Sequence, residues 1–229
     1  MKTKAKSAAA PAKKRVIIVD DHPMMREGLA QLLNAQPDFV VCGEAGDASL
    51  GLDQIKATRP DLVLADITLP GRNGIEFIKD IQALAPETSV LVLSMHDESL
   101  YAERVLRAGG RGYIMKQEGG KKILEAMRQV ISGKIYLSAK MSAQILEVFS
   151  GRRGPDSKVE TLSDREFEIY QLIGQGMDTK DMARQLNLSP KTIDVHRANI
   201  KAKLKLASMS ELIRHAVRWV ESEGQGQSR

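Results

Sequence analysis

The sequence predicts a doubly wound α/β domain with a five-stranded parallel sheet, joined by a linker to a smaller all-α domain. Short β-branched runs alternate with helical patterns over roughly the first 130 residues, as in strand–helix repeats. A stretch rich in Gly, Ser and charge follows, and after it only short helical patterns remain. A chain of 229 residues is long enough for two domains of ordinary size.

Short apolar runs predict the strands, because strands buried on both faces of a parallel sheet are apolar throughout. The helices between them are bounded by capping or breaking residues, such as Asp47 before the second and Pro86 after the third. Strands are expected at Val16–Val19, Phe39–Val41, Leu62–Leu64, Val90–Leu93 and Gly112–Met115, and helices at Met24–Leu33, 47–56, Gly74–Leu84, Glu98–Ala108 and Lys121–Ile131.

The second half of the chain carries capping signals for a set of short helices. Ser163 and Glu166 form a capping-box pattern, Asp178 can cap a second helix, and Ser189 followed by Pro190 can start a third. A fourth helix is expected from Ser208 to Trp219. The expected organisation is a disordered basic tail at 1–14, the α/β domain at 15–132, a linker with one helix at 133–160, the all-α domain at 161–222 and a disordered tail at 223–229.

Charge and cysteine content narrow the class of protein. Residues 16–151 hold 14 basic and 18 acidic side chains, whereas residues 152–229 hold 14 and 11, so the second domain is the one expected to meet a polyanion. Cys42 is the single cysteine, which excludes an intrachain disulfide and fits a reducing compartment. Neither a membrane span nor a secretory signal is expected, and we predict a cytoplasmic protein.

Polar side chains follow four of the predicted strands. Asp20 and Asp21 follow the first, Asp66 the third, Ser94 the fourth and Lys116 the fifth. Because the carboxyl ends of parallel strands share one edge of a sheet, these side chains are expected to converge. Converging carboxylates favour a hard cation such as Mg²⁺, and a cation, an ammonium and a hydroxyl suit a phosphoryl group that is transferred to a carboxylate.

The segments LVLADITLPGRNG, LVLSMH and GYIMK, together with the paired aspartates, resemble a bacterial response-regulator receiver, a flavodoxin-like fold, over residues 15–132. The resemblance implies that a sensor histidine kinase phosphorylates Asp66. It also implies that Ser94 and Lys116 contact the phosphoryl group. The Lys116–Gln117 bond departs from the lysine–proline that the family usually has. The resemblance also implies that Asp21, Asp66 and the backbone carbonyl of Thr68 bind Mg²⁺ directly, and that Asp20 helps to hold it through water.

The same resemblance implies a two-state switch. Ser94 moves toward the phosphoryl group, and Tyr113 rotates into the space that it leaves. The alternative for Tyr113 is a half-buried aromatic side chain on an edge strand.

The span LSDREFEIYQLIGQGMDTKDMARQLNLSPKTIDVHRANIKAKLKL, residues 162–206, resembles a LuxR-type helix-turn-helix, and both resemblances together indicate the NarL/FixJ family. On the third helix Ile193, Ile200 and Leu204 share one face, which leaves a basic face for the DNA major groove. A solvated helix face is the alternative. Phosphate contacts are expected from Arg197, Lys201, Lys203 and Lys205, and contacts near the bases from Lys191, Thr192, Asp194 and Val195, although an ion pair of Asp194 with Lys191 or Arg197 is an equal alternative.

The expected function is a DNA-binding transcriptional regulator activated by phosphorylation, which acts as a homodimer on double-stranded DNA and contacts RNA polymerase. A DNA-binding scaffold that does not use phosphorylation is the first alternative. An aspartate-nucleophile phosphohydrolase is the second, but it needs an Asp-x-Asp motif, and here Ile67 and Thr68 follow Asp66. We therefore expect no enzyme activity.

Overall fold

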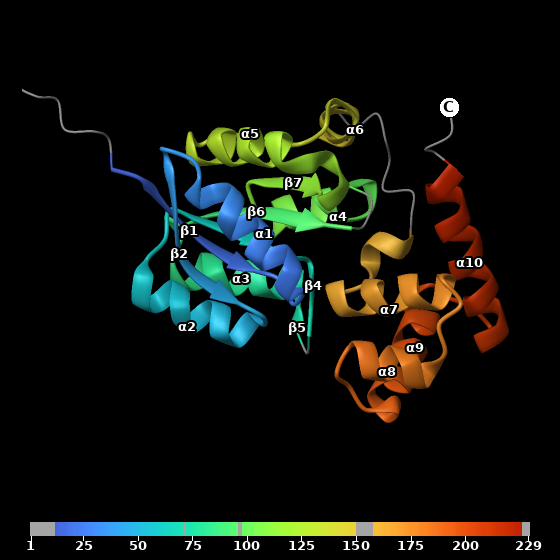
Figure 1. The fold of residues 1–229 in the computed structure, drawn as a ribbon. Coiled ribbons are helices and arrows are strands. Elements are labelled where there is room, and N and C mark those ends of the chain that lie inside the picture. The colour runs from blue at the N-terminus through green and yellow to red at the C-terminus, as the bar shows by residue number, and fades with distance from the viewer. Residues whose placement is uncertain (1–11, 71, 96–97, 150–157, 226–229) are drawn as a thin grey trace, which may run out of the picture.

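The structure is a computed structural model that describes residues 12–70, 72–95, 98–149 and 158–225. The five long strands of its larger domain are parallel, in the order β2-β1-β3-β6-β7 (Figure 1). The chain continues from β1 to β2 on one side of the sheet and from β3 to β6 and β7 on the other. The carboxyl ends of β1 and β3 therefore lie at the topological switch point of the sheet. The strands are β1 (Lys14–Val19), β2 (Phe39–Ala45), β3 (Leu62–Ala65), β6 (Ser89–Ser94) and β7 (Gly112–Met115).

Helices cover both faces of this sheet, which confirms the predicted doubly wound α/β fold. Leu33 of α1 and Met127 of α5 share one buried cluster on one face, and Ile55 of α2, Phe77 of α3 and Val105 of α4 belong to the cluster on the other. The helices are α1 (Pro23–Asn34), α2 (Ala48–Thr58), α3 (Gly74–Leu84), α4 (Glu98–Arg107) and α5 (Gly119–Ile131).

Two features around the sheet were not predicted. β4 (Thr68–Leu69) and β5 (Arg72–Asn73) form a small antiparallel hairpin between Asp66 and α3. The segment after α5 runs beside β7, where the Tyr113 N–H donates to the Tyr136 carbonyl at 3.0 Å. It leads into α6 (Ala139–Phe149), which is the helix expected in the linker. A short 3-10 turn, η1 (Lys116–Glu118), follows β7.

The second domain is all-helical, as predicted. The Ser163 capping box forms with Glu166, and the Asp178 and Ser189 side chains accept from backbone N–H groups of the first turns that follow them. Ile193, Ile200 and Leu204 are buried on one face of the third helix of this domain, which confirms the predicted inner face. The elements are η2 (Lys158–Thr161), α7 (Asp164–Gly174), α8 (Thr179–Gln185), α9 (Pro190–Lys203) and α10 (Met209–Gln225).

The expected tails differ from the structure where it describes them. Lys14 belongs to β1 and forms an ion pair with Asp61 at 2.8 Å, because the first strand begins before the β-branched run does. At the other end α10 continues to Gln225, into the expected tail. Residues 1–11 and 226–229 lie outside the described residues. No helix of the described ranges is long and apolar enough to cross a bilayer.

Candidate phosphoacceptor site and DNA-binding face

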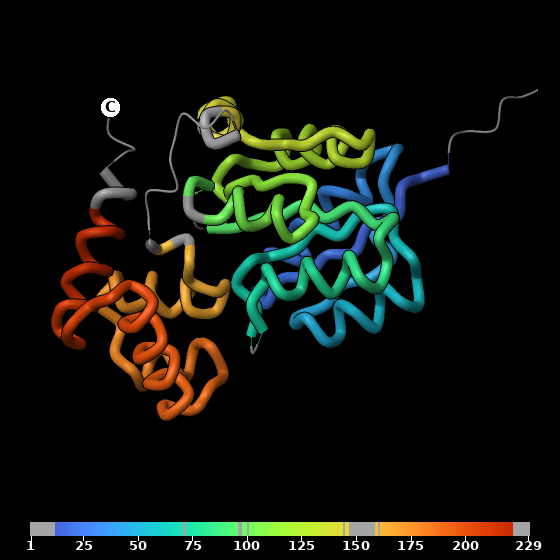
Figure 2. Tube along the Cα trace, turned by 180° about the vertical axis from the view of Figure 1, so that it is seen from behind, coloured from blue at the N-terminus to red at the C-terminus, as the bar shows by residue number. Residues whose placement is uncertain are grey.

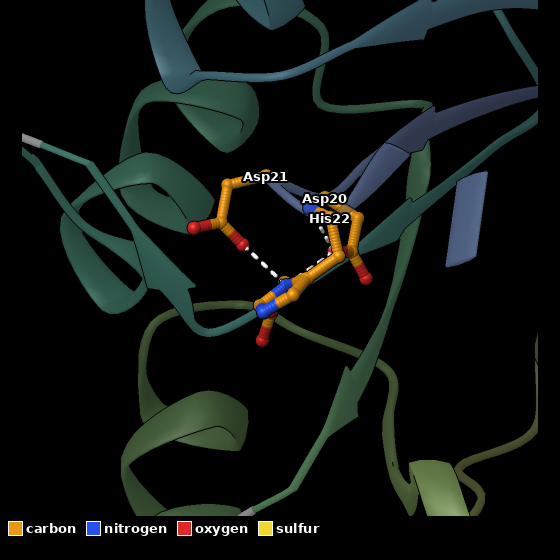
Figure 3. A group of neighbouring side chains, drawn as sticks. Asp20, Asp21 and His22 are labelled. Carbon is orange, nitrogen blue, oxygen red and sulfur yellow. Dashed lines mark hydrogen bonds and ion pairs between the residues drawn. The ribbon is translucent and has the colours of Figure 1, made fainter. Parts of the chain in front are cut away.

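The structure brings together the acidic residues that follow β1 and β3. Asp20, Asp21, His22 and Asp66 each offer one ligand atom, and these four atoms lie within 4.8 Å of one another. Asp20 and Asp66 are buried, whereas Asp21 is partly exposed. Figure 3 shows Asp20, Asp21 and His22 side by side after β1, with dashed lines from the His22 ring to the two carboxylates. His22 was not singled out in the sequence, and its Nδ1 lies 2.6 Å from Asp21 Oδ1 and 3.2 Å from Asp20 Oδ1.

Lys116 reaches the same site from the end of β7. Its Nζ lies 2.7 Å from Asp20 Oδ2 and 2.7 Å from Asp66 Oδ2, and its side chain is 3% exposed. The unusual Lys116–Gln117 pair therefore does not displace the ammonium group. Lys116 links the two buried carboxylates that the sequence placed far apart.

Burial and charge act in opposite directions on these groups. Burial raises the pKa of Asp66, the Lys116 ammonium opposes this rise, and the nearby Asp20 carboxylate adds to it. Burial alone lowers the pKa of Lys116, but the Asp66 and Asp20 carboxylates outweigh burial and the pKa of Lys116 is raised. Three carboxylates face one ammonium, so the site has an excess of negative charge.

This excess charge and the oxygen-rich donor set fit a hard divalent cation such as Mg²⁺. Asp20, Asp21 and Asp66 supply the carboxylate oxygens. The Thr68 N–H donates to Asp66 Oδ1 at 3.2 Å, which fixes the acceptor loop next to the carboxylate. The role of the Thr68 carbonyl as a metal ligand stays a prediction.

Ser94 and Tyr113 lie on the neighbouring strands β6 and β7, and both are buried. Tyr113 is 1% exposed, so the alternative of a half-buried edge aromatic is wrong. The rotation of Tyr113 on phosphorylation stays a prediction.

The outer face of α9 carries the predicted base-facing side chains in an exposed position. Lys191 and Asp194 are exposed, and Val195 is 52% exposed although it is apolar. Asp194 lies 3.7 Å from Arg197, the ion pair that was the alternative to base contact. Thr192 is partly exposed, and its hydroxyl lies 2.8 Å from that of Ser189 at the helix start.

Two of the predicted phosphate contacts have partners inside the domain. Arg197 donates to the Thr179 hydroxyl of α8 at 2.6 Å, and Lys203 lies 2.5 Å from Glu166 of α7. Both contacts tie α9 to the helices beneath it. Lys201 is partly exposed and Lys205 is exposed, so these two have the freer side chains for a phosphate backbone.

The sequence did not identify Glu166 as the partner of Lys203, because the predicted capping box already accounted for Glu166. It also missed Asn73, which lies in the unpredicted hairpin and contacts α7. The sequence carried only a weak signal of this contact. Glu168 and Gln171 of α7 are polar, and only the structure shows that both are buried.

Fold and site define the class of this protein: a receiver domain with an aspartate pocket, joined to a helix-turn-helix DNA-binding domain. Family models agree with this division. Residues 16–128 match the response regulator receiver domain, and residues 160–216 match the LuxR family of bacterial regulatory proteins.

Similar proteins and solved structures support the same class. The oxygen regulatory protein NreC of Staphylococcus haemolyticus is 33% identical over 89% of this chain and 97% of its own length. A LuxR-family response regulator of Aurantimonas is 32% identical, with a TM-score of 0.56, over 61% of this chain and 99% of that chain. The response regulator RcsB, solved in a complex with DNA, is 26% identical, with a TM-score of 0.55, over 89% of this chain and 97% of that chain. The chain belongs to the NarL/FixJ family and is a DNA-binding two-component response regulator.

Proposed function

We propose that a sensor histidine kinase phosphorylates this protein on Asp66 with Mg²⁺ bound, and that phosphorylation controls transcription through α9. One observation carries the proposal: Asp66 is buried beside Lys116, with Asp20 and Asp21 close by. The Asp66 carboxylate attacks the phosphorus of the kinase phosphohistidine, and the P–N bond breaks so that the imidazole of the kinase leaves. The Lys116 ammonium balances the charge of the phosphoryl oxygens. Mg²⁺ would supply a second positive charge here, held directly by Asp21, Asp66 and the Thr68 carbonyl and through water by Asp20.

Ser94 and Tyr113 are the switch pair in this proposal, with the Ser94 hydroxyl toward the phosphoryl group. On the DNA side, Lys201 and Lys205 contact phosphates, and Lys191, Asp194 and Val195 lie nearest the bases. Thr192 completes the helix start, whereas Arg197 and Lys203 hold α9 in place. The protein acts as a homodimer on duplex DNA in the cytoplasm and contacts RNA polymerase there.

Phosphorylation is tested by mass spectrometry of the intact protein with acetyl phosphate and Mg²⁺. We expect the wild type to gain one phosphoryl group and Asp66→Asn to gain none. Asp61→Asn is the matched control, because Asp61 lies at the opposite end of β3 and pairs with Lys14. A magnesium-independent gain, or a gain in Asp66→Asn, contradicts the proposal.

The same preparations separate the scaffold alternative from the proposed regulator. If phosphorylation controls DNA binding, acetyl phosphate tightens binding of the wild type to genomic promoter fragments and leaves Asp66→Asn unchanged. Equal binding of both proteins under the donor supports the scaffold instead. Sustained turnover of a generic phosphomonoester would support the phosphohydrolase.

Salt dependence tests the assignment of lysines on α9. Lys201→Ala is expected to reduce the salt slope of binding to a generic duplex by about one unit per site, because one phosphate contact and its released counterion are lost. Lys203→Ala is expected to leave the slope nearly unchanged and to lower the melting temperature, because it removes the cation beside the buried Glu166. The reverse pattern would exchange the two assignments.

A further inference from the structure

We infer that Asp194 makes this protein select a cytosine in its DNA site, by accepting a hydrogen bond from the amino group of that base in the major groove. The inference rests on the proposed function and adds the base preference of the same interface. Asp194 is the single acidic residue of α9, which also holds four Lys and Arg residues. A carboxylate on this face is repelled by the DNA phosphates, so it lowers affinity unless it finds a hydrogen-bond donor on the DNA.

The position of Asp194 on α9 suits contact with base edges. The Thr192 N–H donates to the Ser189 hydroxyl at 3.1 Å, and this cap fixes the first turn of the helix. Asp194 begins the next turn, and its side chain is 64% exposed. Side chains near the N-terminus of a recognition helix are the ones that reach base edges. Figures 1 and 2 show α8 and α9 below α7, the helix that contacts the receiver, and Asp194 stays open to solvent.

The partner of Asp194 inside the domain does not saturate its carboxylate. Arg197 Nη1 lies 3.7 Å from Asp194 Oδ1, a separation longer than a hydrogen bond. The same Nη1 donates to the Thr179 hydroxyl at 2.6 Å, and the Arg197 side chain is only 17% exposed. Arg197 is therefore held by α8, and the Asp194 carboxylate can still accept from a donor on the DNA.

Small and apolar side chains surround Asp194 on the outer face of α9. Ala198 lies one turn after Asp194 and Ala202 one turn further, and both are exposed. Val195 is also exposed, and it has no donor that would compete for the carboxylate. An aspartate side chain is short, so it reaches a base only where the helix backbone comes close to the groove floor. These small neighbours permit that approach.

The chemistry of a carboxylate decides which base it selects. An ionised carboxylate only accepts hydrogen bonds, and the donors in the major groove are the amino groups of cytosine and adenine. Guanine and thymine present acceptor oxygens there, which repel a carboxylate. Adenine has the N7 acceptor beside its amino group, whereas cytosine has a C–H group beside its own. Cytosine is therefore the base that Asp194 accepts best.

In vitro selection from random DNA duplexes, with acetyl phosphate and Mg²⁺ present, tests this preference. We expect the wild type to enrich a C·G pair at one position of its site. Asp194→Ala is expected to lose about tenfold of the discrimination at that position, and Asp194→Asn is expected to prefer adenine there. Both variants are expected to bind a generic duplex more tightly than the wild type, because they lose a negative charge.

Asp181→Asn is the matched control, because Asp181 is an exposed carboxylate of α8 that pairs with Arg184 at the surface. The change removes the same charge from the same domain and is expected to keep the sequence preference of the wild type. If both Asp194 variants keep cytosine wherever the wild type selects it, the inference is wrong while the proposed function stands. If the wild type selects no sequence at all, the DNA-binding part of the proposed function fails and the inference fails with it.

A chemical change in the DNA tests the contact itself. N4-methylcytosine keeps its base pairing, but a methyl group replaces the amino hydrogen that faces the major groove. The wild type is expected to bind the selected duplex about tenfold more weakly when this cytosine is methylated at N4, whereas Asp194→Ala is expected to bind both duplexes equally. N4-methylation of a cytosine outside the selected site is the control. An equal loss in the wild type and Asp194→Ala, or no loss in the wild type, overturns the inference.

Discussion

Lys116→Met is expected to lower the free energy of unfolding by about 3 kcal/mol at pH 7 without Mg²⁺, and to prevent phosphorylation. The reason is the arrangement of charge around this ammonium, which lies 2.7 Å from both Asp20 and Asp66. Without it, two buried carboxylates face each other with no cation between them. Methionine has a similar length, so the change removes the charge and leaves little empty space.

The pH dependence of this variant follows from the sign of the pKa shift. Burial already raises the pKa of Asp66, and loss of Lys116 removes the group that opposes this rise. A carboxyl whose folded pKa is raised binds protons more tightly in the folded state, so stability falls as pH rises through that pKa. The variant is therefore expected to become more stable when the pH is lowered from 7 to 5. Its free energy of unfolding is also expected to rise more on addition of Mg²⁺ than that of the wild type.

Urea denaturation at both pH values, with and without Mg²⁺, measures these effects. Lys56→Met, at an exposed position of α2, is the control and is expected to change stability by less than about 0.5 kcal/mol. An equal response of the two variants to Mg²⁺ would show that Lys116 does not balance the acidic pocket.

Gly74→Ala is expected to destabilise the receiver by about 3 kcal/mol and to slow phosphorylation. A Cβ at this position would lie 2.3 Å from the Ile67 carbonyl oxygen and 2.6 Å from its Cα. These are backbone atoms next to Asp66, so the clash can be relieved only by moving the acceptor loop. The substitution is therefore expected to lower both the rate of phosphorylation and the stability of the receiver.

Gly28→Ala is the matched control in the same domain. A Cβ there meets no atom within 4 Å, and Gly28 lies inside α1. Alanine is the better helix former, so this variant is expected to be more stable by about 0.5–1 kcal/mol. Thermal unfolding and the rate of phosphorylation by acetyl phosphate measure both variants. A Gly74→Ala protein with wild-type kinetics would show that the loop tolerates the shift.

The parts of the fold that the sequence predicted are those marked by local patterns, such as apolar runs and capping residues. Gly112–Met115 and Gly74–Leu84 have the bounds expected from their apolar runs and flanking residues. The capping residues Asp47, Asp178 and Ser189 all accept from the backbone as expected, because a cap depends only on its own first turn. The acceptor pocket could also be predicted, because parallel strands place their carboxyl ends at one edge of the sheet.

Contacts between elements remote in sequence were the part that could not be predicted. β4 and β5 have two residues each, too few for any periodic pattern. Lys203 looked like a free cation because Glu166, its partner, lies in another helix. The contact of Tyr101 with α7 depends on how two complete domains meet, and neither segment alone contains that information.

The chain after α5 is hydrogen-bonded along β7, and this limits the distance between the receiver and the DNA-binding domain. Tyr136 is bonded to that strand, and α6 follows it directly. While α6 stays in place, only residues 150–157 connect it to η2, and their contour length is at most about 30 Å. The DNA-binding domain therefore stays within this reach of α6, and its contacts with α4, such as Asp164 with Arg104, form between groups at a high effective concentration.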